Sequence, residues 1–243
     1  DLEKCTEIIT KNADVLAAVI MEPISSNFGY VPATPEFLQG IRDLTTQLGI
    51  VLIFDEVQSF RLSSGGAQEL YGVTPDVTTF GKIIGGGLPI GAWGGKDELM
   101  SLYDNEKGPV ISHAGTFHAN PATMVAGVET LKQLTPEVFT RLNSLGDEIR
   151  AKINAVFGEL EIPGQATGMG SLFAIQFSDE EITDYRSMLR GDQELKKVLY
   201  TGLMNEGILM FAKVQGAVCS LTGEREIDTL VDSVRNVLQR IKR

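Results

Sequence analysis

The sequence predicts an α/β protein in which a largely parallel sheet is covered by helices and is followed by a smaller α+β part. Strand-like and helix-like segments alternate over the first 135 residues. The run Ile50–Phe54 is apolar throughout, as in strands buried on both faces of a parallel sheet. Beyond Thr135 the chain is richer in amphipathic helices. We therefore expect a larger α/β domain over residues 1–135 and a small α+β domain over residues 136–243.

The elements of the larger domain follow from local signals. Pro35 is suited to open a helix, and Gly49 stands where a left-handed residue would end it. In chain order we predict a helix over residues 2–12, a strand over 15–21, a helix over 35–48, strands over 50–54 and 76–80, and a helix over 121–134.

The elements of the smaller domain are mostly helical. Its last segment places apolar residues at helical spacing, which predicts one buried face. In chain order we predict a helix over residues 136–156, a strand over 171–177, a helix over 193–205, an extended segment over 216–221 and a helix over 224–243.

Composition excludes several classes of protein. The formal net charge is −11, which disfavours nonspecific nucleic-acid binding because such binding needs Lys and Arg to neutralise phosphates. No apolar run approaches the roughly 18–20 residues of a membrane helix, and the N-terminus does not resemble a signal peptide. The two cysteines, Cys5 and Cys219, favour reduced thiols in a cytoplasmic protein. His113 and His118 have no nearby carboxylate cluster, so we predict no metal site.

Asp55 is the first candidate site residue. It directly follows the run Ile50–Phe54, at the carboxyl end of a predicted strand. In open α/β sheets, ligands bind outside those ends. Capping of the following turn is an equally ordinary role for such an aspartate. A buried carboxylate still needs a partner, and a protonated ring nitrogen of a cofactor would be one.

Lys82 is the second candidate, because it follows the next predicted strand and should reach the same crevice. A lone lysine is usually a solvated surface charge. Here Phe80 and Ile83 flank it, and glycines nearby let the backbone approach a ligand closely. A phosphate-binding loop is excluded, because Asp76 and Ile83 occupy positions where that motif requires Gly and Ser or Thr.

Asp and Lys at successive strand ends fit the chemistry of pyridoxal 5′-phosphate (PLP). A lysine amine forms a Schiff base with the cofactor aldehyde and later moves a proton as base and acid. An aspartate keeps the ring nitrogen protonated, so that the ring accepts electrons.

Three linked motifs resemble the core signature of class III PLP-dependent aminotransferases. They are Phe54-Asp-Glu-Val-Gln58, Gly72-Val-Thr-Pro-Asp76 and Thr79-Phe-Gly-Lys-Ile-Ile-Gly-Gly-Gly-Leu-Pro-Ile-Gly91. Within that family the chain most resembles glutamate-1-semialdehyde 2,1-aminomutases and the aminotransferases close to them. The resemblance implies the aspartate aminotransferase-like fold, PLP as cofactor and pyridoxamine 5′-phosphate as its aminated form.

The resemblance also implies roles for individual residues. Lys82 resembles the Schiff-base lysine and Asp55 the partner of the ring nitrogen. Val57 resembles the residue packed against the ring face, a position that simple core packing would also explain. Asn27 resembles the asparagine near the phenolic oxygen of the cofactor, although its local sequence indicates only a turn.

Gly115 and Thr116 resemble the segment that binds the cofactor phosphate of a partner subunit. A hydroxyl and backbone amides suit a phosphate, but a Gly-Thr pair is a weak signal by itself. The resemblance implies a homodimer with shared active sites and a small amino or keto substrate. Relatives also have an N-terminal portion with a second phosphate-binding loop, which we expect to be missing from this chain.

The natural reaction stays open between alternatives. An aminomutase isomerises one substrate, whereas an aminotransferase needs a second amino acceptor, and both would use Lys82 and Asp55. The shortened segment Val57–Arg61 is typical of β-amino-acid aminotransferases, whereas the absence of arginine between Gly191 and Glu224 slightly favours the aminomutase. A catalytically inactive PLP-fold binding module is the non-enzymatic alternative, which retention of both Lys82 and Asp55 disfavours.

Overall fold

The structure is a computed structural model that describes residues 1–104, 106, 108 and 111–242. The chain divides into two compact units: unit 1 comprises Asp1–Pro23 and Ala33–Pro136, and unit 2 comprises Ile24–Pro32 and Glu137–Arg243. The sequence-based division placed all of residues 1–135 together. The structure instead assigns the segment Ile24–Pro32 to unit 2. Its backbone carbonyls accept hydrogen bonds from the side chains of Thr167 and Gln215, which lie far along the chain.

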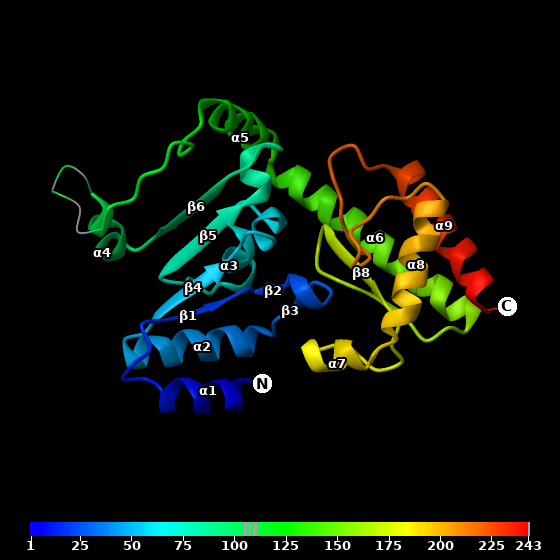
Figure 1. Cartoon of the computed structure of the whole chain (residues 1–243), viewed down its shortest axis with the longest axis horizontal. Coiled ribbons are helices and arrows are strands. Elements are labelled where there is room, and N and C mark those ends of the chain that lie inside the picture. The colour runs from blue at the N-terminus through cyan, green and yellow to red at the C-terminus, as the bar shows by residue number, and fades with distance from the viewer. Residues whose placement is uncertain (105, 107, 109–110, 243) are drawn as a thin grey trace. The chain divides into compact units, whose positions relative to one another are not determined.

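Unit 1 is built on a four-stranded sheet in the order β1-β4-β5-β6 (Figure 1). The first three strands are parallel, and β6 pairs antiparallel with β5 at one edge. The strands are β1 (Ala18–Met21), β4 (Val51–Asp55), β5 (Val77–Gly81) and β6 (Gly91–Gly95). The helices of unit 1 are α1 (Leu2–Lys11), α2 (Pro35–Leu48), α3 (Gly66–Tyr71), α4 (Asp97–Met100) and α5 (Pro121–Gln133).

Helix α2 has the bounds that its sequence predicted. Thr34 caps its N-terminus by accepting a hydrogen bond from the backbone N–H of Phe37 at 3.2 Å. Pro35 occupies its first turn, and Gly49 ends it with φ +67°. The predicted helix was therefore correct at both ends.

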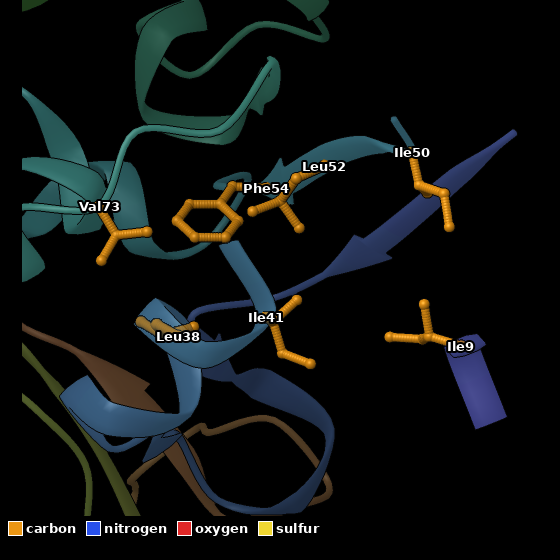
Figure 2. Close-up of a cluster of buried hydrophobic side chains, with 7 residues drawn as sticks. All are labelled: Ile9, Leu38, Ile41, Ile50, Leu52, Phe54 and Val73. Atoms are coloured by element: carbon orange, nitrogen blue, oxygen red, sulfur yellow. The ribbon is translucent and has the colours of Figure 1, made fainter. Parts of the chain in front are cut away.

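One face of the sheet carries the hydrophobic core of unit 1. Leu52 and Phe54 of β4 are fully buried and pack against Leu38 and Ile41 of α2 (Figure 2). Helix α1 lies beside α2 and contributes Ile9 to the same cluster. Because side chains alternate along a strand, Asp55 projects to the opposite face.

That opposite face is only partly covered within the described chain. Val51, Ile53 and Asp55 of β4 are half-buried, and Ile20 of β1 is 62% exposed. In this chain β4 is therefore fully buried on one face and half-buried on the other. The open face is the one that carries Asp55.

Unit 2 contains a three-stranded antiparallel sheet in the order β7-β8-β9. The central strand β8 is buried along its whole length, and α9 turns its apolar face inward through Ile227, Val234 and Leu238. The strands are β7 (Gln165–Thr167), β8 (Leu172–Gln176) and β9 (Gln215–Ala217), with the short pair β2 (Ile24–Ser25) and β3 (Val31–Pro32). The helices are α6 (Pro136–Leu160), α7 (Tyr185–Arg190), α8 (Gln193–Asn205) and α9 (Glu224–Lys242).

Within the described residues, no helix has the length and apolarity that crossing a membrane requires.

Candidate active site

Asp55 is the last residue of β4, at the carboxyl end of a strand with a parallel neighbour on each side. Its Oδ1 atom accepts hydrogen bonds from the Thr79 hydroxyl at 3.0 Å and from the backbone N–H of Val57 at 3.1 Å. Among the described residues, no donor reaches its second oxygen, Oδ2. One carboxylate oxygen is thus held in place, while the other can accept a bond from a ligand.

Lys82 directly follows β5, the strand next to β4. It has φ +49°, a left-handed conformation that costs about 1–2 kcal/mol for a residue with a side chain. Its side chain is exposed, and within the described part of the chain no hydrogen bond or ion pair engages its amine. A strained backbone that presents a free amine at a strand end is typical of a functional position.

The glycine-rich stretch after Lys82 is held by close packing against α5. A Cβ atom on Gly86 would lie 2.3 Å from the carbonyl oxygen of Ala126, and one on Gly127 would lie 2.3 Å from that of Ile84. Larger residues at either position would push the two segments apart. The glycines therefore support the turn that presents Lys82.

The turn after Asp55 is anchored by a buried carboxylate. Glu56 accepts hydrogen bonds from the Ser59 hydroxyl at 2.9 Å and from the backbone N–H groups of Ala67 and Gln68 at 2.5 and 3.0 Å. These bonds tie the start of α3 to the end of β4. Val57, the next residue, lies against Gly81, because a Cβ atom on that glycine would be 3.3 Å from Val57 Cγ1. The structure thus brings Asp55, Val57 and Lys82 together at the ends of two neighbouring strands.

Gly115 and Thr116 lie in an exposed turn that aromatic side chains hold to the sheet edge. The backbone N–H of His118 donates to the Gly115 carbonyl at 3.1 Å. His113 stacks on His118 with a ring separation of 4.4 Å and contacts Trp93 of β6 edge-on at 4.3 Å. Trp93 pairs with Thr79 across the sheet, so it projects to the same face as Asp55.

The start of α5 follows this turn, and the free backbone N–H groups of a helix start can bind a phosphate. Asn120 already caps this helix, because its Oδ1 accepts from the backbone N–H groups of Ala122 and Thr123 at 3.0 and 3.4 Å. Two of the N–H groups that a helix start leaves without a helical partner therefore already donate to Asn120 and are not available to a phosphate.

Asn27 belongs to unit 2 and lies in the 3-10 turn Ser26–Phe28. Its Oδ1 accepts a hydrogen bond from Lys213 Nζ at 2.7 Å. The amide group is oriented by this bond, because an amide whose oxygen faces an ammonium turns its NH₂ group the other way.

Sequence reasoning missed the residues that hold these side chains. Thr79 supports Asp55 from the neighbouring strand, and Lys213 supports Asn27 from a distant loop. Strand register would have revealed Thr79, since it lies opposite Asp55. Local sequence offers no comparable signal for the contact between residues 27 and 213.

The residues of unit 1 fit PLP on the observations above. No described residue engages Asp55 Oδ2, which could accept a ring N–H, or the Lys82 amine, which could bond to an aldehyde. Val57 offers an apolar contact next to Gly81.

Comparisons with known proteins agree with this geometry. The profile of class III aminotransferases matches residues 2–235. The chain is 43% identical over 211 residues to glutamate-1-semialdehyde 2,1-aminomutase 2 of Lachnoclostridium phytofermentans, covering 86% of this chain and 49% of that protein. The chain thus spans about half the length of this curated relative.

Two solved structures have the same fold. An omega-transaminase from Sphaerobacter thermophilus superposes with a TM-score of 0.94 at 44% identity, over 98% of this chain and 55% of that one. A β-phenylalanine aminotransferase from Variovorax paradoxus superposes with a TM-score of 0.93 at 33% identity, over 99% and 56%. The predicted fold class is thereby confirmed, and the chain belongs to the class III aminotransferase family.

Proposed function

We propose that this chain carries out PLP-dependent amino-group transfer, with Lys82 as the covalent anchor of the cofactor. One observation carries the proposal. Lys82 and Asp55 lie at the ends of neighbouring parallel strands, and each presents an atom that no described residue engages. A protein without catalytic activity would need neither Lys82 in a strained backbone conformation nor Asp55 with one carboxylate oxygen available.

PLP, when bound, supplies an aldehyde for amine exchange and a ring that accepts electrons. The Lys82 amine would bond to the aldehyde and, once displaced, would move a proton between substrate and cofactor carbons. Asp55 Oδ2 would accept the ring N–H and keep that nitrogen protonated. Val57 would pack on the ring face, and the Asn27 amide would donate to the phenolic oxygen. In the aminated form, pyridoxamine 5′-phosphate, the same residues would hold the cofactor.

The leading reaction is an isomerisation like that of glutamate-1-semialdehyde 2,1-aminomutase. The name of the relative at 43% identity supports this reaction. The absence of arginine between Gly191 and Glu224 is a second, weaker support, because a β-amino-acid aminotransferase would favour one there to hold a carboxylate.

A second candidate is transamination of a β-amino acid or a related amine with a keto-acid acceptor. The two transaminase structures with TM-scores above 0.9 support it, and one of them is a β-phenylalanine aminotransferase. The shortened segment Val57–Arg61 supports it as well. A catalytically inactive binding module is the alternative of another class.

The decisive experiment assays the protein expressed from its complete coding sequence. Turnover of glutamate-1-semialdehyde without an added amino acceptor would support the isomerisation, and strict dependence on a keto acid would support transamination. Visible absorbance that borohydride bleaches would report the bond between Lys82 and the cofactor. If the wild-type protein lacked that absorbance, the hypothesis of a catalytically inactive binding module would be favoured over both enzymatic hypotheses.

We also propose a cytoplasmic homodimer in which Gly115 and Thr116 bind the cofactor phosphate of the partner subunit. The exposure of the turn that contains both residues supports this arrangement. Closed twofold dimers are the commonest soluble oligomers.

A further inference from the structure

Glu56 directly follows Asp55, and its side chain is completely buried. Each oxygen of its carboxylate accepts two hydrogen bonds. Oε2 accepts from the Ser59 hydroxyl and the Ala67 backbone N–H, and Oε1 accepts from the backbone N–H and the side-chain amide of Gln68. A carboxyl group that only accepts is in its ionised form. Among the described residues, no lysine or arginine forms an ion pair with this charge.

A buried charge held by neutral donors alone is sensitive to geometry. Removing a carboxylate from water is costly, and here only hydrogen bonds offset the cost. All four bonds form together in a single arrangement of the turn, so the charge specifies that arrangement more strictly than apolar packing would. Glu56 therefore does more than fill space at the end of β4.

The same network connects β4 to β5, the strands that carry the candidate site residues at their ends. The backbone N–H of Glu56 donates to the Thr79 carbonyl of β5 at 3.0 Å. The side-chain amide of Gln68 donates both to Glu56 Oε1 at 3.1 Å and to the Thr78 hydroxyl of β5 at 3.2 Å. The buried carboxylate thus helps to fix one strand end relative to the other.

The turn around Glu56 has little room to adjust. Gly66 has φ +73°, and a Cβ atom there would lie 2.5 Å from Glu56 Oε2. On the other side, the backbone N–H of Val57 donates to Asp55 Oδ1 at 3.1 Å, and the Val57 side chain lies against Gly81. A displacement of Glu56 would therefore move both of its neighbours in the chain.

Asp76 is a second buried carboxylate on the same two strands, with different surroundings. It accepts a hydrogen bond from the backbone N–H of Leu52, and two cations pair with it. Because β4 and β5 are parallel and Asp76 precedes β5, it lies at the end of the strands opposite to Asp55. It stabilises the same part of the sheet away from the site, which makes it a matched control.

We propose that Glu56 is a positioning residue for the cofactor site. Its charge fixes the turn that carries Asp55 and Val57, and so determines how the Asp55 carboxylate meets the ring nitrogen of PLP. This inference rests on the proposed function, because it concerns the bound cofactor. Glu56 would touch neither cofactor nor substrate, since its carboxylate is engaged by the start of α3. Hydrogen bonds weaken steeply when their angle is poor, so a misplaced Asp55 would hold the ring proton less well.

The test uses the protein from its complete coding sequence, loaded with PLP that carries ¹⁵N in its ring. The NMR signal of that nitrogen reports whether it is protonated. Glu56→Gln keeps the size of the side chain but replaces one acceptor by an NH₂ group that faces other donors. Its signal should move towards that of the unprotonated ring. Proton transfer in a single turnover should slow by up to about 100-fold, the effect of misplacing a reacting group, while KM changes little.

Three further variants separate positioning from general stability. Asp76→Asn should lower the free energy of unfolding and leave the ring-nitrogen signal unchanged. Glu69→Gln alters an exposed carboxylate of the same loop, which accepts from the Gly65 N–H at 2.8 Å, and should leave the signal unchanged as well. Gln68→Met keeps Glu56 but removes its bridge to β5, so it should shift the signal in the same direction by a smaller amount. This variant carries the test if Glu56→Gln does not fold.

A wild-type signal in Gln68→Met, or in folded Glu56→Gln, would overturn the positioning role. An equal shift in Asp76→Asn would overturn it too, because the effect would then follow from destabilisation alone. Asp55→Asn in the same measurement separates this inference from the proposed function. If Asp55→Asn shifts the signal and Glu56→Gln does not, the positioning role fails and the proposed function stands. If Asp55→Asn leaves the signal unchanged, the proposed contact between Asp55 and the ring nitrogen is itself wrong.

Discussion

The chemistry of the site depends on how individual side chains are held. Asp55 has one oxygen fixed by Thr79 and by the Val57 backbone, which leaves the other in a defined direction. No described residue bonds to the amine of Lys82, which is positioned instead by its left-handed backbone. The aspartate is therefore constrained through its side chain, and the lysine through its main chain.

Replacement of Lys82 by alanine should abolish turnover and the visible absorbance of the bound cofactor. The fold should persist, because the side chain is exposed and forms no hydrogen bond or ion pair with a described residue. Circular dichroism and thermal unfolding would verify the fold, and absorbance spectra the covalent bond. Near-normal activity in this variant would refute the assigned role of Lys82.

Replacement of Asp55 by asparagine should leave PLP binding intact but slow the proton transfer by about 100-fold or more, the scale of losing one preorganised electrostatic contact. The neutral amide cannot hold the ring nitrogen protonated. Single-turnover rates would measure the effect. Thr79→Val is the companion variant, and its loss should be smaller because the carboxylate survives. An unchanged rate in Asp55→Asn would show that another residue keeps the ring nitrogen of the cofactor protonated.

The buried Lys196 makes a prediction about stability against pH. Burial lowers its pKa in the folded state to about 8 from the ordinary value of 10.5. Between these pH values the unfolded chain binds more protons, so the free energy of unfolding should rise with pH by an amount on the order of 1 kcal/mol. Lys196→Met should remove that rise. Urea unfolding of the wild type and of Lys196→Met at pH 7.5 and 10 tests this prediction. An equal change in the free energy of unfolding of both proteins would contradict it.

At the scale of elements, buried carboxylates fix the positions of strands and helices around the site. Glu56 joins the end of β4 to α3, and Asp76 joins the start of β5 to its surroundings. Asp76 accepts from the backbone N–H of Leu52 at 2.7 Å and pairs with Arg42 and Lys96 at 3.0 and 2.7 Å. These contacts connect β4, β5, α2 and the end of β6.

Asp76→Asn should lower the free energy of unfolding by about 3 kcal/mol, because it leaves the largely buried guanidinium of Arg42 without its partner. Burial alone would raise the pKa of Asp76, but the Leu52 N–H and the cations Lys96 and Arg42 bring it below its ordinary value of 3.8. Its contribution is therefore present above that value and lost as pH falls through the lower folded pKa. Denaturant unfolding between pH 7 and 3 should show that the free energy of unfolding falls less on acidification in the variant than in the wild type.

The control for that experiment is Lys96→Met. Lys96 is 59% exposed, so its ion pair with Asp76 should contribute no more than about 1 kcal/mol. A loss in Lys96→Met as large as that in Asp76→Asn would show that the Leu52 and Arg42 contacts are not the important ones.

At the scale of the whole molecule, the proposed dimer builds each site from two chains. Thr116→Val removes a hydroxyl at similar volume and should weaken PLP affinity by about 1–3 kcal/mol, the range for a lost donor to a charged acceptor. A heterodimer of Lys82→Ala and Thr116→Val chains would hold one site with both lesions and one with neither. Such mixtures should regain activity that neither parent shows in full. Heterodimers without that gain would place the phosphate contacts within a single chain.

The sequence by itself determined the local elements and the family. Helix α2 begins and ends where Pro35 and Gly49 predicted, and α8 and α9 also follow their sequence signals. The last residue of the helix predicted over 224–243 lies outside the described residues. Asp55 and Lys82 were found because each follows a predicted strand, and the signals that predict a strand are local to the chain. Strand ends in a parallel sheet share one edge, which made their proximity predictable as well.

Only the tertiary structure decided the contacts between distant segments. It placed Ile24–Pro32 with unit 2 and joined Lys213 to Asn27 across 186 positions of sequence. Hydrophobic periodicity reports which side of an element is buried, and it carries no information on which polar groups meet. The Lys196–Gln176 pair illustrates the reason, since a lysine in a helix and a glutamine in a strand are each unremarkable until folding buries both.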